Sequence, residues 1–389
     1  MTQYCVKAGY MPLVDAAPLI VAKELGFANE EGLRLDLQPA PSWSTLRDRL
    51  LFGQIQAAHM LAPVPIASAI QDNSGLPKLV VLSGLSSNGN VFGVSKKLRT
   101  RLRANGLLFD FENAKLAGDA LADLHVPLKI GVPFALSMHA ELVTFWLTKS
   151  GLQQGQDFQI IAVPPPLMAQ AMQDGILDAF CVGEPWGSVT VATADAGLML
   201  PSVAIWSNAP EKVLSARDGW VGENPECVKR LMRAVWRAGE WLANPDHLTT
   251  TSEVLARSEY LGIPAETIDC ALWGRMIINQ NNDIRTTPNF LKFNGVDTCF
   301  PWKSRASWIA ERLANRLNLD PTASIAKSRE IYRSDLYREN LGALGADLPL
   351  SSSKIEGALD GPVEVSGVSK SLILNQDQFF DGTIYDPGQ

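Results

Sequence analysis

The chain has 389 residues, which is enough for two domains or for one two-lobed unit with a large core. Hydrophobic residues make up 46% and charged residues 19%, a balance that excludes a disordered chain. The net charge of -7, with no long run of Lys or Arg, argues against a direct nucleic-acid partner. No window of 18 consecutive apolar residues is present, so we expect no insertion into a membrane.

Strand and helix patterns alternate from the first residues onward. Strands are predicted at residues 4–8, 33–38 and 56–60, and helices at residues 12–25 and 42–51. Gly26 ends the first helix, and Ser42 or Ser44 caps the second. This order, with short turns, predicts an α/β fold with a parallel sheet and right-handed crossovers.

The rest of the chain divides into a second α/β unit and a helical extension. Further strands are predicted at residues 79–84, 91–95, 129–133 and 159–163, and helices at residues 137–150, 167–173 and 228–241. We assign residues 1–95 and 205–389 to a first lobe with a C-terminal helical extension, and residues 96–204 to a second lobe. Two crossings between the lobes predict a hinge of two segments, with the ligand cleft between the lobes.

An internal repeat supports the two-lobe reading. Residues 53–63 (GQIQAAHMLAP) are matched 122 positions later by residues 175–185 (GILDAFCVGEP), with Gly, Ala and Pro in register. Each copy follows a helix, turns at Gly, and runs as an apolar strand to Pro. Two such strands predict two similar lobes that open onto a shared cleft, where a small molecule would bind.

The five cysteines are widely spaced and form neither a CxxC pair nor a Cys/His cluster with metal spacing. We therefore expect reduced thiols, no metal and no other cofactor. The first ten residues have no basic region, apolar stretch or A-x-A site typical of a secretory leader. These features favour a cytoplasmic protein; the alternative is a periplasmic protein whose signal peptide was removed.

Six segments, in order along the chain, resemble one family. They are residues 9–27, 42–48, 59–65, 137–139, 183–186 and 210–212. Together they are similar to the nitrate- and bicarbonate-binding proteins of ABC importers, the NrtA/CmpA type. The resemblance implies a type II periplasmic-binding-protein fold, in which two α/β lobes joined by a two-segment hinge close on an anion.

The resemblance leaves two functions open. One branch of the family consists of cytoplasmic NasS-type nitrate/nitrite sensors, which hold an RNA-binding NasT-type antiterminator until the anion arrives; the N-terminal pattern favours this reading. The alternative is a substrate-binding component that delivers nitrate, nitrite, cyanate or bicarbonate to an ABC permease. An enzyme on the same scaffold is a remote alternative, because no catalytic motif is present.

Three residues carry the expected anion site. The resemblance implies that Lys212 contacts the oxyanion, and its ammonium supplies a compact charge with three donors. Trp43 offers one indole N–H and a flat wall for a flat anion. His139 follows Ser137 at the start of the helix at 137–150, where N–H groups favour an anion.

Five further residues complete the expected set. Asn88 and Gly89 form a polar turn that either contacts the ligand or is an ordinary Asn-Gly turn. Glu184 is expected to orient Lys212 or His139, or to lock the hinge. Asp15 matches a pocket-side residue of the family, although a helix N-cap is its expected role. His59 either faces the cleft or ends a strand, and Trp186 is expected to pack.

Overall fold

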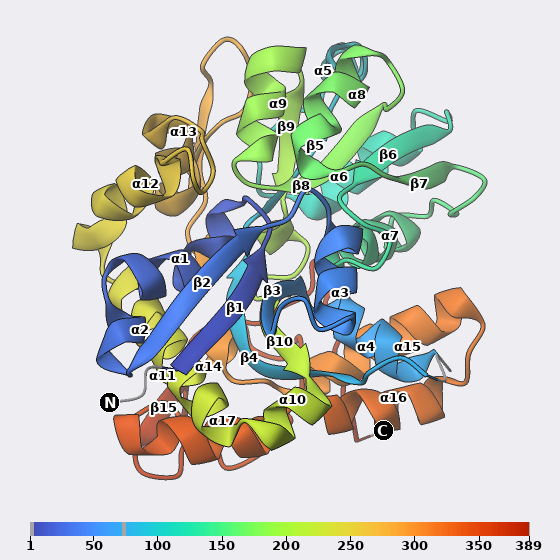
Figure 1. Cartoon of the computed structure of the whole chain (residues 1–389). Coiled ribbons are helices and arrows are strands. Elements are labelled where there is room, and N and C mark those ends of the chain that lie inside the picture. The colour runs from blue at the N-terminus through green and yellow to red at the C-terminus, as the bar shows by residue number, and fades with distance from the viewer. Residues whose placement is uncertain (1–3, 72–74, 389) are drawn as a thin grey trace.

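The computed structural model describes residues 4–71 and 75–388. Figure 1 shows two lobes, one above the other, each built on a β-sheet with helices against it. The predicted α/β fold with two lobes is confirmed. No helix within the described ranges has the length and apolar character needed to cross a bilayer.

The first lobe is built on a six-stranded sheet in the order β13-β4-β10-β3-β1-β2. Its strands are β1 (Tyr4–Tyr10), β2 (Leu33–Pro39), β3 (Ala57–Leu61), β4 (Leu79–Asn88), β10 (Pro210–Arg217) and β13 (Leu291–Lys292). The sheet is mixed, since β1 runs parallel to β2 and β3, whereas β10 runs antiparallel to β3 and β4. Its helices are α1 (Ala17–Glu24), α2 (Phe27–Glu30), α3 (Trp43–Leu51) and α4 (Pro63–Ile70).

The second lobe is built on a five-stranded sheet in the order β7-β6-β8-β5-β9. Its strands are β5 (Asn90–Val94), β6 (Leu128–Val132), β7 (Phe158–Ala162), β8 (Ala179–Gly183) and β9 (Gly197–Pro201). Its helices are α5 (Lys96–Ala104), α6 (Ala114–Ala122), α7 (Met138–Lys149), α8 (Met168–Gln173) and α9 (Trp186–Ala194). Ser137 caps α7, because its hydroxyl accepts a hydrogen bond from the Ala140 N–H at 3.2 Å.

The internal repeat occupies equivalent places in the two sheets. β3 lies between a parallel neighbour, β1, and an antiparallel neighbour, β10. β8 likewise lies between the parallel β6 and the antiparallel β5. Both are fully buried, which explains why both read as short apolar runs, and each is followed by a helix, α4 or α9.

The chain crosses from the first sheet to the second at Gly89, between β4 and β5. The prediction that residues 91–95 belong to the first lobe is therefore wrong: β5 hydrogen-bonds β8 and β9 of the second sheet. Gly89 has φ +88, a backbone conformation that favours glycine, and its N–H donates to the Phe290 carbonyl at 2.7 Å. The return crossing lies between β9 and β10, around the 3-10 helix Ser202–Ala204.

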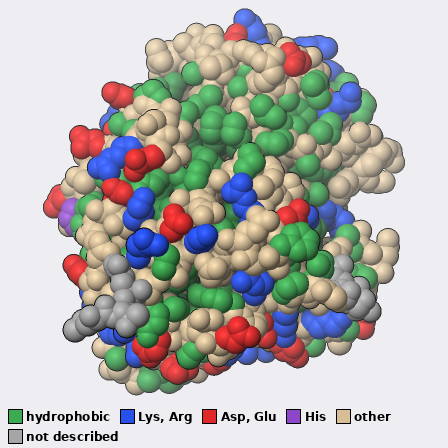
Figure 2. Space-filling model, viewed as in Figure 1, with side chains coloured by type: hydrophobic (Ala, Val, Ile, Leu, Met, Phe, Trp, Pro, Cys, Tyr) green, Lys and Arg blue, Asp and Glu red, His purple; other side chains and the backbone are tan. Residues whose placement is uncertain are grey.

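The region beyond β10 is mostly helical, as predicted. Its elements are α10 (Asp218–Glu223), α11 (Pro225–Leu242), α12 (Leu248–Ala256), α13 (Ala265–Trp273), β11 (Arg275–Ile277), β12 (Ile284–Thr286), α14 (Val296–Cys299), α15 (Lys303–Leu317), α16 (Pro321–Ile331), α17 (Ser334–Leu341), β14 (Val363–Ser366) and β15 (Ser371–Leu374). α15 reaches the second lobe, where Arg316 Nη2 lies 2.6 Å from Glu141 Oε1 of α7. On the face shown in Figure 2, Lys and Arg are interspersed with Asp and Glu.

Gly84→Ala should destabilise the protein, because a Cβ at this position of β4 would lie 1.8 Å from the Thr298 backbone carbonyl oxygen. We expect the free energy of unfolding to fall by about 2 kcal/mol or more, as in overpacked cores. Chemical denaturation measures the change. Gly219→Ala in α10 is the matched control, since its Cβ meets nothing within 4 Å; equal effects of the two substitutions would contradict the packing described here.

Candidate functional site

A buried ion cluster lies where the two lobes meet. Lys212 Nζ is 2.7 Å from Asp15 Oδ2 and 2.9 Å from Glu211 Oε1. His59 Nε2 is 3.0 Å from Asp15 Oδ1, and the Lys212 ammonium lies 5.6 Å from the centre of the Trp43 ring. These side chains are at most 4% exposed, so the cluster is closed to solvent.

The second lobe contributes two side chains to the same cluster. Asn90, the first residue of β5, donates through Nδ2 to Glu211 Oε2 at 2.5 Å. His139 Nδ1 of α7 lies 3.6 Å from Glu211 Oε1. Glu211 therefore connects the lobes. Hereafter the Lys212 cluster means Asp15, Trp43, His59, Asn90, His139, Glu211 and Lys212.

A β-bulge brings two successive residues into one cluster. Neighbouring side chains of a strand normally point to opposite faces of the sheet. The pairing of β10 with β4 shifts register on both sides of Lys212, which breaks this alternation. As a result, Glu211 and Lys212 contact each other, although they are adjacent in β10.

Several buried polar atoms of the cluster have no hydrogen-bond partner among the described residues. They are Trp43 Nε1, Asn90 Oδ1, His59 Nδ1 and both ring nitrogens of His139, whereas His59 Nε2 and Asp15 Oδ1 face each other at 3.0 Å. An unpaired buried polar group is costly, so such groups are rare in folded proteins. Their concentration around one ammonium fits a binding site for a small polar ligand.

The net charge of the Lys212 cluster depends on whether Glu211 is ionised. Burial lowers the pKa of Lys212, but Asp15 and Glu211 outweigh burial and raise the pKa above its usual value. Burial raises the pKa of Asp15, yet Lys212 and His59 hold it well below its usual value. Burial raises the pKa of Glu211 and lowers the pKa of His59 and of His139. With both imidazoles neutral, the net charge is -1 when Glu211 is ionised and zero when it is protonated.

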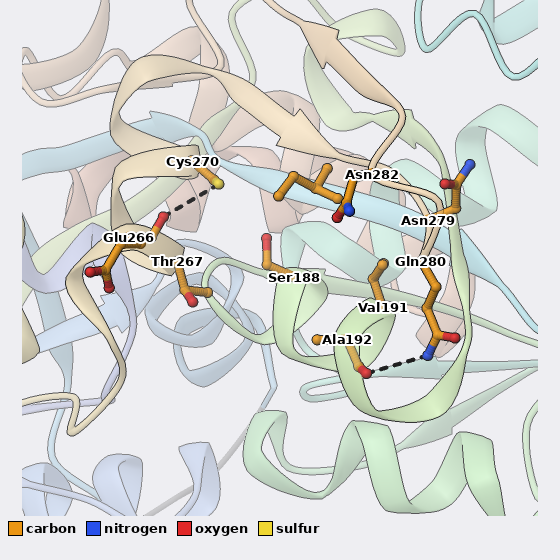
Figure 3. Close-up of a pocket in the computed structure, with 10 residues that line it drawn as sticks. Ser188, Val191, Ala192, Glu266, Thr267, Cys270, Asn279, Gln280 and Asn282 are labelled. Carbon is orange, nitrogen blue, oxygen red and sulfur yellow. Dashed lines mark hydrogen bonds between the residues drawn. The ribbon is translucent and has the colours of Figure 1, made fainter.

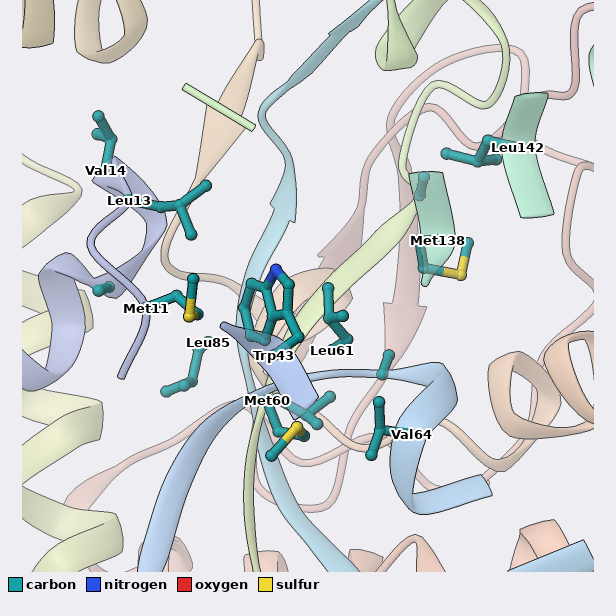
Figure 4. Close-up of a cluster of buried hydrophobic side chains, with 14 of the residues drawn as sticks. Met11, Leu13, Val14, Trp43, Met60, Leu61, Val64, Leu85, Met138 and Leu142 are labelled. Carbon is teal, nitrogen blue, oxygen red and sulfur yellow. The ribbon is translucent and has the colours of Figure 1, made fainter. Parts of the chain in front are cut away.

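Apolar side chains from both lobes surround the cluster. Figure 4 shows Trp43 at the centre, with Leu13 and Leu61 of the first lobe nearby and Met138 and Leu142 of α7 across from them. All five are buried. A low-dielectric wall strengthens every charge–charge interaction inside it.

Five of the eight predicted site residues meet here: Asp15, Trp43, His59, His139 and Lys212. The expected N-cap role of Asp15 is wrong. Asp15 lies in the 3-10 helix Val14–Ala16, and the residue before α1 is Ala16, which makes no side-chain cap. The Asp15 carboxylate instead pairs with Lys212, because an unpaired buried ammonium costs more free energy than an uncapped helix end.

Asn88, Gly89 and Glu184 make other contacts. The amide of Asn88 donates to the carbonyls of Ser207 and Asn289 and accepts from the Ala209 N–H, so it joins the two crossings. Gly89 forms the turn between β4 and β5, with φ +88.

The expectation that Glu184 orients Lys212 or His139 is wrong, since its carboxylate accepts from the Ser188 N–H at 3.1 Å. Burial raises the pKa of Glu184 to about 7. Its backbone does join the lobes, because the Val14 N–H donates to its carbonyl at 2.9 Å. Trp186 is partly buried, and its indole N–H donates to the Pro12 carbonyl at 2.8 Å, a second bond between lobes.

The sequence analysis missed Glu211 and Asn90. Glu211 stands inside the segment 210–212 that marked Lys212, and Asn90 is two residues from Asn88 in the predicted polar turn. The signal that was overlooked is the pairing of a buried lysine with an adjacent carboxylate. Among the described residues no group of three His, Cys, Asp or Glu side chains has the geometry to hold a metal ion.

Lys212→Met should leave two carboxylates buried without their cation, which costs about 3 kcal/mol or more of folding free energy at pH 8. Without Lys212, burial raises the pKa of Asp15 and Glu211 above their unfolded values. Destabilisation by such groups grows as pH rises above the unfolded pKa, so the loss should be smaller at pH 5. Urea denaturation at both pH values measures it; an equal loss at both, or none, would contradict the charge assignment. The exposed Lys97→Met serves as the control.

Comparisons with known proteins agree with the fold and with the expected resemblance. Residues 2–256 match the NMT1-like family. The nitrate/nitrite binding protein NrtA of Nostoc sp. is 28% identical over 390 residues, covering 98% of this chain and 82% of that protein. The bicarbonate-binding protein CmpA of Synechococcus elongatus is 25% identical over 98% of this chain and 84% of its own length.

The crystal structure of the periplasmic nitrate-binding protein NrtA from Synechocystis PCC 6803 superposes with a TM-score of 0.84. The two chains are 27% identical, and the match covers 99% of this chain and 96% of the other. The resemblance to the NrtA/CmpA type is thus confirmed. Since the family match spans well over half of the sequence, this chain belongs to the NMT1-like family.

Proposed function

We propose that the protein binds nitrate or nitrite in the Lys212 cluster and serves as the substrate-binding component of an ABC importer. The observation that carries the proposal is a buried ammonium surrounded by unpaired polar atoms from both lobes. An ammonium has three N–H donors, of which Asp15 and Glu211 take two, so one remains for an anion. Trp43 Nε1 and the ring of His139 supply further donors from opposite sides.

Binding requires a proton as well as an anion. The cluster carries no net positive charge while both imidazoles are neutral, and burying an unbalanced anion there would cost several kcal/mol. A proton on Glu211 or His139, which lie 3.6 Å apart across the lobe boundary, brings the net charge of the cluster from -1 to zero, so that nitrate then adds a single negative charge. Nitrate would therefore enter together with about one proton.

The lobes have to separate for a ligand to enter, because the cluster is closed to solvent. The crossings at Gly89 and at residues 202–209 supply the hinge. Three contacts between lobes hold the closed arrangement: Trp186 with Pro12, Val14 with Glu184, and Glu141 with Arg316. An anion that touches Lys212 and His139 adds a further link and so favours closure.

Transport is favoured over the cytoplasmic sensor expected from the N-terminal pattern. The relatives include NrtC of Synechocystis, named a nitrate import ATP-binding protein, which is 28% identical over 95% of this chain and 55% of its own length. The Synechocystis NrtA is periplasmic. We infer an ABC permease as the partner and the periplasm as the place of action, with no catalysis. A NasT-like regulatory partner has no support from these relatives.

Calorimetric titration with nitrate, nitrite, bicarbonate and sulfate tests the proposal. We expect nitrate or nitrite to bind, and sulfate to fail because a dianion adds a second unbalanced charge. Trp43→Phe removes the unpaired indole N–H and should weaken nitrate binding by roughly tenfold, the effect of one lost hydrogen bond, with little loss of stability. Tight binding of bicarbonate alone would move the protein to the bicarbonate branch, and no binding of any anion would refute the proposal.

Nitrate affinity should fall as pH rises through the pKa of Glu211, which burial raises above the usual range of a glutamate, because Glu211 has to be protonated when the anion binds. Glu211→Gln supplies the neutral side chain permanently, so its affinity at pH 8 should be roughly tenfold higher and less dependent on pH. Titration in phosphate and in Tris buffers detects the bound proton directly through the heat of buffer ionisation. The exposed Glu240→Gln is the control; wild-type affinity independent of pH would contradict proton coupling.

A further inference from the structure

The C-terminal region forms a segment that lies across the boundary between the lobes. We call residues 375–385, which follow β15, the C-terminal strap. The backbone of Tyr385 exchanges two hydrogen bonds of 2.9 Å with Glu356, whose carboxylate accepts a third from Ser304 of α15 at 2.6 Å. Asp377, near the start of the strap, is fully buried. Because α15 packs against α4, these contacts fix the strap to the first lobe.

The strap also binds the backbone of the return crossing between the lobes. The Phe380 N–H donates to the Ile205 carbonyl at 2.9 Å. The Ser207 N–H donates to the Gln378 carbonyl, also at 2.9 Å. These two bonds form an antiparallel pair around Trp206, which is fully buried. The return crossing is therefore held along one side by the strap, which adds a third segment to the hinge.

Beyond the crossing, the strap reaches helix α7 of the second lobe. Glu141, Phe145 and Lys149 are spaced four residues apart, so they share one face of this helix. The ring centres of Phe145 and Phe379 are 5.3 Å apart. Lys149 Nζ lies 3.2 Å from Asp381 Oδ2. Glu141 pairs with α15, so this face of α7 rests along its length on elements that are fixed to the first lobe.

The same helix carries a residue of the Lys212 cluster. His139, at the start of α7, lies 3.6 Å from Glu211 of β10 in the first lobe. The cluster is closed to solvent, so an anion can reach it only when the lobes separate and α7 moves away from β10. Because packed helices move as rigid units, Phe145 and Lys149 would then have to leave the strap.

The other side of the lobe boundary is more loosely packed. In Figure 1, α7 and α15 lie at the right of the boundary, whereas α13 lies at the left. A cavity of about 450 Å³ separates α9 of the second lobe from α13, which packs against the 3-10 helix that carries Asp15. Figure 3 draws two hydrogen bonds among the lining residues, and neither joins α9 to α13. Since a cavity removes packing contacts, the strap side supplies a larger share of the contacts that keep the lobes closed.

We propose that the C-terminal strap is a conformational restraint that holds α7 against the first lobe and sets how readily the lobes separate. The proposal rests on the proposed function, because it concerns the same opening of the lobes that admits the anion. A weaker strap leaves the lobes open for a larger fraction of the time. The C-terminal region thereby controls access to a cluster to which it contributes no side chain.

Hydrogen exchange at the Val14 amide, measured by NMR without nitrate or nitrite, tests the strap. This N–H is buried and donates to the Glu184 carbonyl of the other lobe, so it exchanges when the lobes separate. Phe380→Ala removes a ring whose centre lies 5.9 Å from that of Phe145. We expect it to speed Val14 exchange by about fivefold, the effect of one lost aromatic pair.

Lys149→Met, at an exposed position, removes the ion pair between α7 and the strap and should speed Val14 exchange by about twofold. The matched control is Lys115→Met, because Lys115 pairs with Asp119 inside the second lobe and should leave the exchange unchanged.

Two further amides separate opening of the lobes from unfolding. The Ala40 N–H is bonded within the first lobe and the Leu128 N–H within the second, each at 2.9 Å. Both should exchange as in wild type. If Phe380→Ala accelerates all three amides, Lys149→Met decides the question, since an exposed substitution does not threaten the fold.

Unchanged or slower Val14 exchange in Lys149→Met and in a folded Phe380→Ala would overturn the proposal. Saturating nitrate should slow Val14 exchange in wild type, because an anion held by both lobes favours closure. Exchange that responds to the strap substitutions but not to nitrate would support the strap and refute the anion site, so the two failures are distinguished.

Discussion

The closed form of this protein depends on the neutralisation of one buried ammonium. Lys212 is fully buried, and a lysine in that position is stable only with opposite charges in contact. Asp15 provides one of these charges from a 3-10 helix. Glu211 provides the other from the lysine's own strand, where a β-bulge brings the two neighbouring residues into contact. This pairing holds the ammonium in place before any ligand arrives, so part of the cost of organising the site is already met in folding. The same pairing leaves the cluster without net positive charge, so on the proposed function an anion would bind together with a proton.

On the proposed function, the connection between the lobes would allow this site to open and close. Asn88 at the first crossing hydrogen-bonds Ser207 and Ala209 at the second, so the two crossings form one joined hinge. Contacts that hold the lobes together lie at some distance from it, at Trp186 and at Glu141. Glu211 connects the two lobes, because it contacts Lys212 on its own strand and Asn90 and His139 of the second lobe. On the proposed function, closure and ligand contact would therefore involve the same side chains.

Much of the fold was predictable from the sequence, because it depends on local patterns. The repeat at residues 53–63 and 175–185 correctly identified β3 and β8, whose burial makes both apolar. The assignment of β5 failed, because periodicity does not reveal which sheet a strand joins; β5 pairs with residues 179–183 and 197–201, which are 85 to 110 positions away.

The site residues likewise fall into those that the sequence predicted and those whose roles only the structure revealed. Trp43, His139 and Lys212 came from a resemblance, and Glu211 stands directly beside Lys212 in the sequence. The role of Asp15, in contrast, follows from charge pairing in three dimensions, which no local pattern contains. Asn88 and Asn90 differ in role because Asn88 bonds the hinge backbone and Asn90 bonds Glu211.

A crystal structure of the protein grown with nitrate would test the central claim most directly. The account predicts one planar anion within hydrogen-bonding distance of Lys212 Nζ, Trp43 Nε1 and the ring of His139. The contrary result would be nitrate bound elsewhere, or a Lys212 cluster without an anion in a crystal saturated with it.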